Sequence, residues 1–287
     1  MLNVASFYKY ADIENPAEFK EEHLDFCKSI GVKGRILVAA EGINGTVCGT
    51  PKQVELYKIE LSSNPLFSGI EFKENECLMY PFNKMNIKIK PELVRFEQPV
   101  SHKDGGQHLS PQEFLNMAQQ EDVVILDARN SYESKVGKFA NAITLDIETF
   151  REFPKASQVL KDKKDKKILM YCTGGIRCEK ASAFMRKSGF TQVFQLHGGI
   201  LNFGKQFPDQ LWQGKCFVFD NRLVSSINTT DNPISECESC KVPCDLYVNC
   251  YNKKCNKLAV ICPECNRNLY GCCSPDCLSQ LNITKIH

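Results

Sequence analysis

The distribution of cysteine restricts the possible folds of this chain more than any other feature of its sequence. Ten of the 16 cysteines fall between Cys237 and Cys277, and the other six are spread over the preceding residues. Eight of the ten form pairs with two to four residues between partners, a spacing that lets both sulfurs reach one tetrahedral zinc ion. This stretch is therefore predicted to be a small module folded around metal. The pairs are Cys237 with Cys240, Cys250 with Cys255, Cys262 with Cys265, and Cys273 with Cys277.

Two zinc ions, each held by four thiolates, would use all the paired cysteines and leave Cys244 and Cys272 spare. The spacing does not specify which pairs share an ion. Disulfides are the alternative, but the first residues have neither a basic start nor a long apolar segment, so we expect no secretory signal. We therefore expect a cytoplasmic protein, in which disulfides are rare and structural zinc is favoured.

Composition is typical of a soluble protein with more than one domain. The 287 residues are 43% hydrophobic and 24% charged, which allows two or three domains with sizeable cores. No apolar run approaches the roughly 20 residues needed to cross a bilayer, so we expect no membrane partner. Because the net charge is only +2, any nucleic-acid binding must come from a local basic patch.

The first segment, residues 1–95, is predicted to be a ferredoxin-like α+β domain. Apolar alternation predicts strands, and stretches with one apolar face, preceded by proline, predict helices. The resulting order β-α-β-β-α-β is that of a ferredoxin-like fold. The expected elements are strands at 3–10, 33–42 and 43–49, helices at 16–31 and 51–64, and a last strand at either 69–76 or 84–91.

The second segment, residues 96–215, is predicted to be an α/β domain with a parallel sheet. Continuous apolar runs at 121–129 and 166–172 indicate buried strands, and 175–190 indicates a helix. Strands that alternate with helices favour a parallel sheet with helices on both faces. The stretch 149–167 is predicted to be helical and solvated. The third segment, residues 216–287, contains the paired cysteines.

A cysteine at the end of one buried strand is the leading candidate for chemistry. The strand ends at Cys172, and the loop that follows leads directly into a helix. Its glycines allow backbone N–H groups to turn inward, and together with the helix N-terminus they form an anion cradle. Arg177 adds a cation, so the thiol is expected to ionise readily and act as a nucleophile. The six residues of this loop are Cys172, Thr173, Gly174, Gly175, Ile176 and Arg177.

The length of this loop favours persulfide chemistry over phosphate chemistry. Cysteine phosphatases use a loop one residue longer, and the shorter loop resembles that of rhodaneses. An upstream motif also resembles rhodaneses, and its Asp127 and Arg129 are expected to form an ion pair that shapes the loop. Cys178, which begins the helix, either assists Cys172 or is a packed thiol. The upstream motif comprises Asp127, Arg129, Glu133, Gly137 and Ala140.

Three stretches together resemble the bacterial rhodanese-domain tRNA uridine hydroxylases. They are EGINGTV at 41–47, YCTGGIRCEKASAF at 171–184, and GKCFVFDNR at 214–222. The resemblance implies an acylphosphatase-like first domain, in agreement with the ferredoxin-like prediction. It also implies that the protein binds the anticodon loop of tRNA, not DNA, and hydroxylates C5 of wobble uridine 34 to 5-hydroxyuridine. Molecular oxygen would be the co-substrate and Cys172 the active-site cysteine, whereas the electron donor is not indicated.

Three functional hypotheses remain open from the sequence. A tRNA hydroxylase is favoured by the three-segment architecture and the resemblance. The length of the loop, taken by itself, favours a sulfurtransferase that holds a persulfide on Cys172 and passes the sulfur to another acceptor. A non-catalytic adaptor that binds RNA or protein is disfavoured, because the complete loop at 172–177 is retained.

Overall fold

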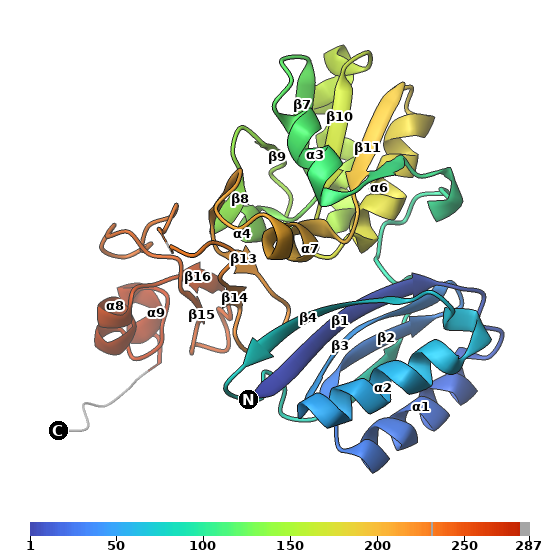
Figure 1. Ribbon diagram of the computed structural model, residues 1–287. Helices are drawn as coiled ribbons and strands as arrows, with labels where there is room; N and C mark the ends of the chain where they lie inside the picture. Colours follow the sequence, from blue (N-terminus) through green and yellow to red (C-terminus); the bar gives the residue numbers. More distant parts are fainter. Residues whose placement is uncertain (231, 282–287) are drawn as a thin grey trace.

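Two α/β units and a smaller cysteine-rich unit follow one another along the chain (Figure 1). The computed structural model describes residues 1–230 and 232–281. No helix among these residues is long and apolar enough to cross a membrane.

The first unit is a five-stranded sheet covered by two helices on one face (Figure 1). Both stretches proposed for the last strand form strands, at opposite edges of the sheet, so the expectation of a single strand was wrong. The second of them pairs parallel to β2 and completes the sheet order β4-β1-β3-β2-β5. The elements are β1 (Leu2–Tyr10), α1 (Pro16–Ile30), β2 (Lys33–Ala39), β3 (Gly42–Gly49), α2 (Pro51–Ser63), β4 (Glu71–Cys77) and β5 (Met85–Ile89).

The two faces of this sheet differ in chemistry because successive side chains of a strand point to opposite sides. Phe7, Ile36 and Val47 belong to the apolar core that the sheet forms with the two helices. The alternate residues, including Ser6 and Arg35, line a cavity on the helix-free face. That face is turned toward the second unit (Figure 1).

The second unit has the predicted parallel sheet with helices on both faces. Its strand order is β6-β11-β10-β7-β9, and all four pairings are parallel. Residues of α5 and α6 pack on one face and residues of α3 and α7 on the other. The elements are β6 (Gln107–Leu109), α3 (Pro111–Ala118), β7 (Val123–Asp127), α4 (Ser131–Ser134), β8 (Gly137–Phe139), β9 (Ile143–Thr144), α5 (Phe153–Ala156), β10 (Lys167–Tyr171), α6 (Ile176–Lys187), β11 (Gln192–Leu196) and α7 (Gly199–Gln206).

The stretch 149–167 is less solvated than predicted. It forms short helical turns, and Phe150, Phe153 and Leu160 are buried in the core beneath the sheet. These apolar residues fall on one side of successive turns, and the many lysines around them obscured that pattern in the sequence. The lysine-rich end of the stretch is largely exposed, as predicted.

The third unit is tied to the other two by its first strands and by polar contacts. Strand β12 pairs with β8 of the second unit, and the Asn221 N–H donates to the Pro81 carbonyl of the first unit at 3.0 Å. The Lys135 ammonium binds Glu238 at 2.7 Å. The elements are β12 (Trp212–Gly214), β13 (Cys216–Phe217), β14 (Val224–Ser225), β15 (Tyr247–Asn249), β16 (Leu258–Val260), α8 (Pro263–Asn268) and α9 (Pro275–Ser279).

Ion pairs hold the first unit against helix α6 of the second. The Lys180 ammonium, almost fully buried, binds Glu41 at 2.8 Å and Glu92 at 3.0 Å. The Tyr8 hydroxyl donates to Glu179 at 2.9 Å. These contacts seat the helix-free sheet face above the carboxyl end of β10, where open α/β sheets form their sites.

Candidate active site and metal centres

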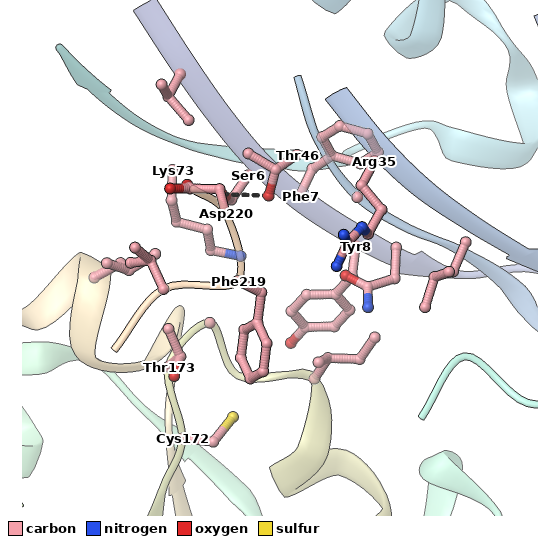
Figure 2. Close-up of a pocket in the computed structure, with 18 of the residues that line it drawn as sticks. Ser6, Phe7, Tyr8, Arg35, Thr46, Lys73, Cys172, Thr173, Phe219 and Asp220 are labelled. Atoms are coloured by element: carbon pink, nitrogen blue, oxygen red, sulfur yellow. Dashed lines mark hydrogen bonds between the residues drawn. The ribbon is translucent and has the colours of Figure 1, made fainter. Parts of the chain in front are cut away.

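A cavity of about 340 Å³ lies where the two α/β units meet (Figure 2). The loop at 172–177 contributes its floor, and the helix-free face of the first unit contributes its roof. The segment after β13 contributes a third wall through Phe219, Asp220 and Arg222. The volume falls in the range of about 300–1,000 Å³ that is typical of small-molecule sites.

Cys172 lies on the floor of this cavity, with its side chain directed toward the cavity (Figure 2). Its sulfur accepts a hydrogen bond from the Gly175 N–H at 3.2 Å. Gly175 has a φ of +103°, a left-handed conformation that favours glycine and points this N–H inward. Burial by itself would raise the pKa of Cys172, but the Cys178 thiol, the Arg177 charge and loop N–H groups lower it to about 6. The sulfur is therefore mostly thiolate at neutral pH.

Arg177 is held in place by a carboxylate to which the sequence assigned no specific role. Glu133, fully buried, accepts two hydrogen bonds from the Arg177 guanidinium, one of them at 2.7 Å. Burial opposes ionisation of Glu133, yet the charge of Arg177 keeps its pKa below the usual range. The Thr173 hydroxyl donates to the same carboxylate at 3.3 Å. Glu133 thus orients the cation that stabilises the thiolate.

Replacing Glu133 by glutamine is expected to lower the free energy of unfolding by about 3–5 kcal/mol, because the buried Arg177 would lose the carboxylate that it binds. Urea unfolding, followed by the fluorescence of the single tryptophan, Trp212, measures this loss. The double variant Glu133→Gln/Arg177→Met should recover much of the stability. An additive loss in the double variant would show that the pair is not energetically coupled.

The expected ion pair between Asp127 and Arg129 forms, but neither residue lines the cavity. Both side chains are fully buried, with 2.6 Å between Nη2 and Oδ2. The Tyr171 hydroxyl donates to Asp127 at 2.7 Å, and Arg129 donates to the Gly137 carbonyl at 2.6 Å. The pair therefore connects the end of β7 to β8 and acts on the site only through the scaffold.

Cys178 is packed in the core beside Cys172, and its assistance to Cys172 stays a prediction. It is completely buried in the core of the second unit, and its thiol donates a hydrogen bond to Cys172. Burial and the adjacent thiolate raise the pKa of Cys178 well above the ordinary value. Cys178 thus remains a neutral donor while Cys172 is ionised.

The alkylation rate of Cys172 is expected to rise with pH and reach half its maximum near pH 6, since only the deprotonated thiolate reacts. Cys178→Ala removes a donor to the thiolate, so the midpoint should move to higher pH. Iodoacetamide labelling of the Cys172 peptide, quantified by mass spectrometry from pH 5 to pH 9, measures both midpoints. An unchanged midpoint in Cys178→Ala would exclude this hydrogen bond as a cause of the low pKa.

Several lining residues come from segments that no local sequence pattern connects with Cys172. Tyr8, Arg35 and Lys73 belong to three strands of the first unit. The available signals were the two outer stretches of the family resemblance. Thr46, within 41–47, and Phe219, within 214–222, both line the cavity.

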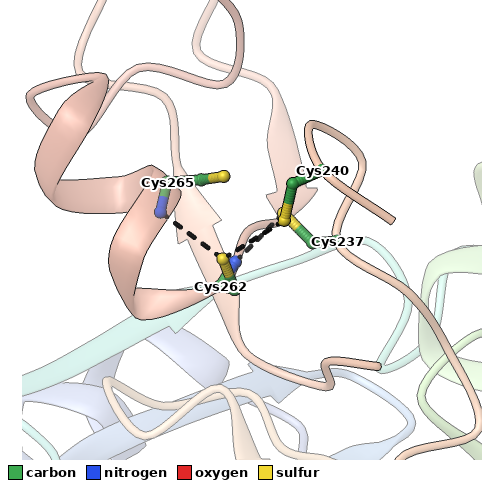
Figure 3. Close-up of side chains that lie close together, drawn as sticks. All are labelled: Cys237, Cys240, Cys262 and Cys265. Carbon is green, nitrogen blue, oxygen red and sulfur yellow. Dashed lines mark hydrogen bonds between the residues drawn. The ribbon is translucent and has the colours of Figure 1, made fainter. Parts of the chain in front are cut away.

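The eight paired cysteines lie in two groups of four. All four sulfurs of each group lie within 4.8 Å of one another. In chain order, the first and third cysteine pairs form one group, which Figure 3 shows, and the second and fourth pairs form the other group. Cys244 and Cys272 belong to neither. The groups are Cys237, Cys240, Cys262 and Cys265, and Cys250, Cys255, Cys273 and Cys277.

Both groups have the donor chemistry and the spacing of a tetrahedral thiolate site. Zn–S bonds of about 2.3 Å place neighbouring sulfurs about 3.8 Å apart. The Cys240 and Cys262 sulfurs are 3.6 Å apart, and those of Cys255 and Cys273 are 3.7 Å apart. The Cys262 N–H donates to the Cys237 sulfur at 3.3 Å, which favours a thiolate there.

Three known protein families together match most of the chain. Residues 2–93 match the UPF0176 acylphosphatase like domain. Residues 110–206 match the rhodanese-like domain, and residues 213–278 match the family described as rhodanase C-terminal. A solved rhodanese-like domain from Anabaena sp. is 22% identical, with a TM-score of 0.32, and the match covers 37% of this chain and 78% of that one.

Curated relatives match over nearly the whole length and carry one name, tRNA uridine(34) hydroxylase. The protein from Bacillus licheniformis is 47% identical over 278 residues, covering 94% of this chain and 86% of the relative. That from Cytophaga hutchinsonii is 42% identical, covering 94% and 88%, and that from Bacillus cereus is 46% identical, covering 96% and 88%. The chain therefore belongs to the tRNA uridine(34) hydroxylase family.

Proposed function

We propose that this chain is a cytoplasmic enzyme that hydroxylates C5 of uridine 34 in the anticodon loop of tRNA, with Cys172 as its nucleophile. The observation that carries the proposal is the stabilised thiolate of Cys172, which lies in a cavity of about 340 Å³. The names of the relatives support uridine 34 as the target.

The proposed reaction uses the thiolate to activate C5 of the base. Addition of the Cys172 sulfur to C6 moves an electron pair toward C5 and the O4 carbonyl, which makes C5 a nucleophile. One atom of molecular oxygen then bonds to C5, and a two-electron donor reduces the other atom to water. Loss of the C5 proton expels the sulfur and restores the double bond. Arg177 and the Gly175 N–H stabilise the sulfur as an anion before addition and after release.

The depth of the cavity requires an extruded base. Cys172 is 1% exposed, so a uridine stacked within the anticodon loop could not reach its sulfur. Proteins that act on single-stranded RNA loops commonly turn one base outward into a pocket and stack it on an aromatic side chain. Phe219, which is 50% exposed and lines the cavity, is the aromatic side chain best placed for this role.

We propose that each group of four cysteines holds one structural zinc ion. The sulfur separations and the N–H donors fit a closed tetrathiolate site, in which no position remains for substrate. Zinc would then stabilise the third unit, whose first segment supplies Phe219 and Arg222 to the cavity.

A persulfide-carrying sulfurtransferase is the second candidate. The six-residue loop and its inward N–H group would also stabilise a terminal persulfide sulfur on Cys172. In that case the uridine-sized cavity would admit a sulfur acceptor.

Nucleoside mass spectrometry of tRNA from a deletion strain, with and without a plasmid copy of the gene, tests the proposal. Loss of nucleosides derived from 5-hydroxyuridine on deletion, and their return on complementation, is the expected result. If these nucleosides are unchanged and a thiolated nucleoside falls instead, the hydroxylase assignment is wrong and the sulfurtransferase takes its place.

A further inference from the structure

A continuous row of polar side chains crosses the helix-free face of the first sheet. On neighbouring strands, Lys73 of β4 lies opposite Ser6 of β1, Ser6 lies opposite Thr46 of β3, and Thr46 lies opposite Arg35 of β2. Directly opposed residues share a face, so all four point the same way. All four line the cavity that contains Cys172.

The two ends of this row are cations without a counter-ion. Lys73 is only 8% exposed, yet among the described residues its ammonium has no ion-pair or hydrogen-bond partner and lies 4.7 Å from the ring centre of Tyr8. Arg35 is exposed and likewise has no carboxylate partner in the part of the chain that the structure describes. The other two arginines that line the cavity are paired, Arg177 with Glu133 and Arg222 with Asp220. Among the described residues, the cavity-lining lysine and arginines without an ion-pair partner are therefore the two on its roof, Lys73 and Arg35.

A charged Lys73 without an ion-pair partner destabilises the protein when no ligand is bound. Burial lowers the pKa of its ammonium, although the nearby Glu71 and Cys172 partly oppose this. A buried cation without a partner costs stability unless an anion compensates it. The side chain extends into the cavity (Figure 2), where an incoming anion could reach it.

The centre of the row adds neutral hydrogen-bond donors between the two cations. The Ser6 and Thr46 hydroxyls lie 2.9 Å apart and form one hydrogen bond, which leaves one of the two hydroxyl protons for a ligand. Neighbouring strands are about 4.8 Å apart, so the Lys73 and Arg35 backbones are about 14 Å apart and their long side chains can converge above the hydroxyls. Two cations and a free hydroxyl form a donor set suited to a phosphate oxyanion.

We propose that the row formed by Lys73, Ser6, Thr46 and Arg35 binds a phosphodiester group of the nucleotide whose base enters the Cys172 loop. This inference rests on the proposed function for the identity of that nucleotide. Phosphate bound on the roof would orient the base toward the floor, with Phe219 between them as a stacking surface (Figure 2). The first unit would thus be the part of the protein that positions RNA over the thiolate.

The test measures coupling between Lys73 and a single phosphate of the RNA. Binding of a uridine 34 anticodon stem-loop to the full chain is measured without oxygen, so that no turnover occurs. A neutral methylphosphonate replaces the linkage on the 5′ or the 3′ side of uridine 34 in turn. With wild type, one of the two replacements is expected to weaken binding about tenfold. With Lys73→Met, the same replacement should weaken binding less than twofold, because the contact is already absent.

Two further variants separate binding from folding. Lys73→Arg retains the charge and should retain most of the sensitivity to the neutral linkage. Lys52→Met removes an exposed lysine of α2, on the opposite side of the sheet, and should behave as wild type. The melting temperature of Lys73→Met should not fall, because an unpaired buried charge is replaced by an apolar side chain of similar length.

The outcomes distinguish this inference from the proposed function. If each neutral linkage weakens binding equally in wild type and Lys73→Met, the row does not bind that phosphate and the inference is overturned. If wild type does not bind the stem-loop at all, both the inference and the proposed function fail. If the coupling is observed but no 5-hydroxyuridine forms when oxygen and a reductant are supplied, the phosphate site stands and the hydroxylase assignment falls.

Discussion

Cys172→Ser is expected to lower the rate of 5-hydroxyuridine formation on tRNA by at least about 10³-fold, the scale typical for removal of a catalytic nucleophile. A serine hydroxyl in the same cradle remains protonated at neutral pH, whereas the pKa of the Cys172 thiol is lowered to about 6. The variant keeps the volume of the side chain and the surrounding hydrogen bonds, so the loss isolates the chemistry of sulfur. Single-turnover formation of 5-hydroxyuridine, quantified by nucleoside mass spectrometry, measures it.

Cys178→Ser is the matched control for this variant. It changes a cysteine in the helix that follows the loop, and its hydroxyl can still donate to the Cys172 sulfur, so activity should stay within about tenfold of wild type. A covalent protein–RNA adduct, trapped by denaturation during turnover, is expected with wild type and with Cys178→Ser. Hydroxylation by Cys172→Ser at the wild-type rate would exclude addition of this sulfur to the base.

Cys262→Ser is expected to reduce the zinc content from two ions to one per chain and to unfold part of the third unit. Cys262 supplies one of the four sulfurs of its group, and its sulfur also accepts the Cys265 N–H at 3.4 Å. Structural zinc contributes about 10–16 kcal/mol to the folding of small zinc modules, so loss of one ligand cannot be offset by the small core of this unit. Metal analysis of the purified protein gives the stoichiometry, and limited proteolysis reports unfolding after residue 216.

Cys244→Ser is the matched control for the metal site. Cys244 lies in the same stretch but belongs to neither group, so the variant should retain two zinc ions and resist the protease as wild type does. A strong chelator should reproduce the effect of Cys262→Ser in both wild type and Cys244→Ser. Loss of zinc from Cys244→Ser would show that the two groups of four sulfurs are not the metal sites.

Local patterns were sufficient to predict most of the elements near the site. The parallel sheet, the strand that ends at Cys172 and the glycine-containing loop follow from apolar runs and glycines that are adjacent in the sequence. Two predictions were wrong, those for the stretch 149–167 and for the last strand of the first unit, because the local sequence pattern there does not indicate which residues are buried or paired. Lysine-rich surroundings concealed the buried Phe150 and Phe153, and two equally strand-like stretches both became edge strands of the first sheet.

The sequence by itself determined the candidate nucleophile and the eight paired cysteines, because each of these depends on residues only a few positions apart. Only the tertiary structure decided how the cysteine pairs combine, since two distant pairs must meet to form each group of four sulfurs. The same holds for the roof of the cavity. Lys73 and Arg35 come into one polar row through the pairing of four strands, and no local spacing encodes a register between strands that are distant in the sequence.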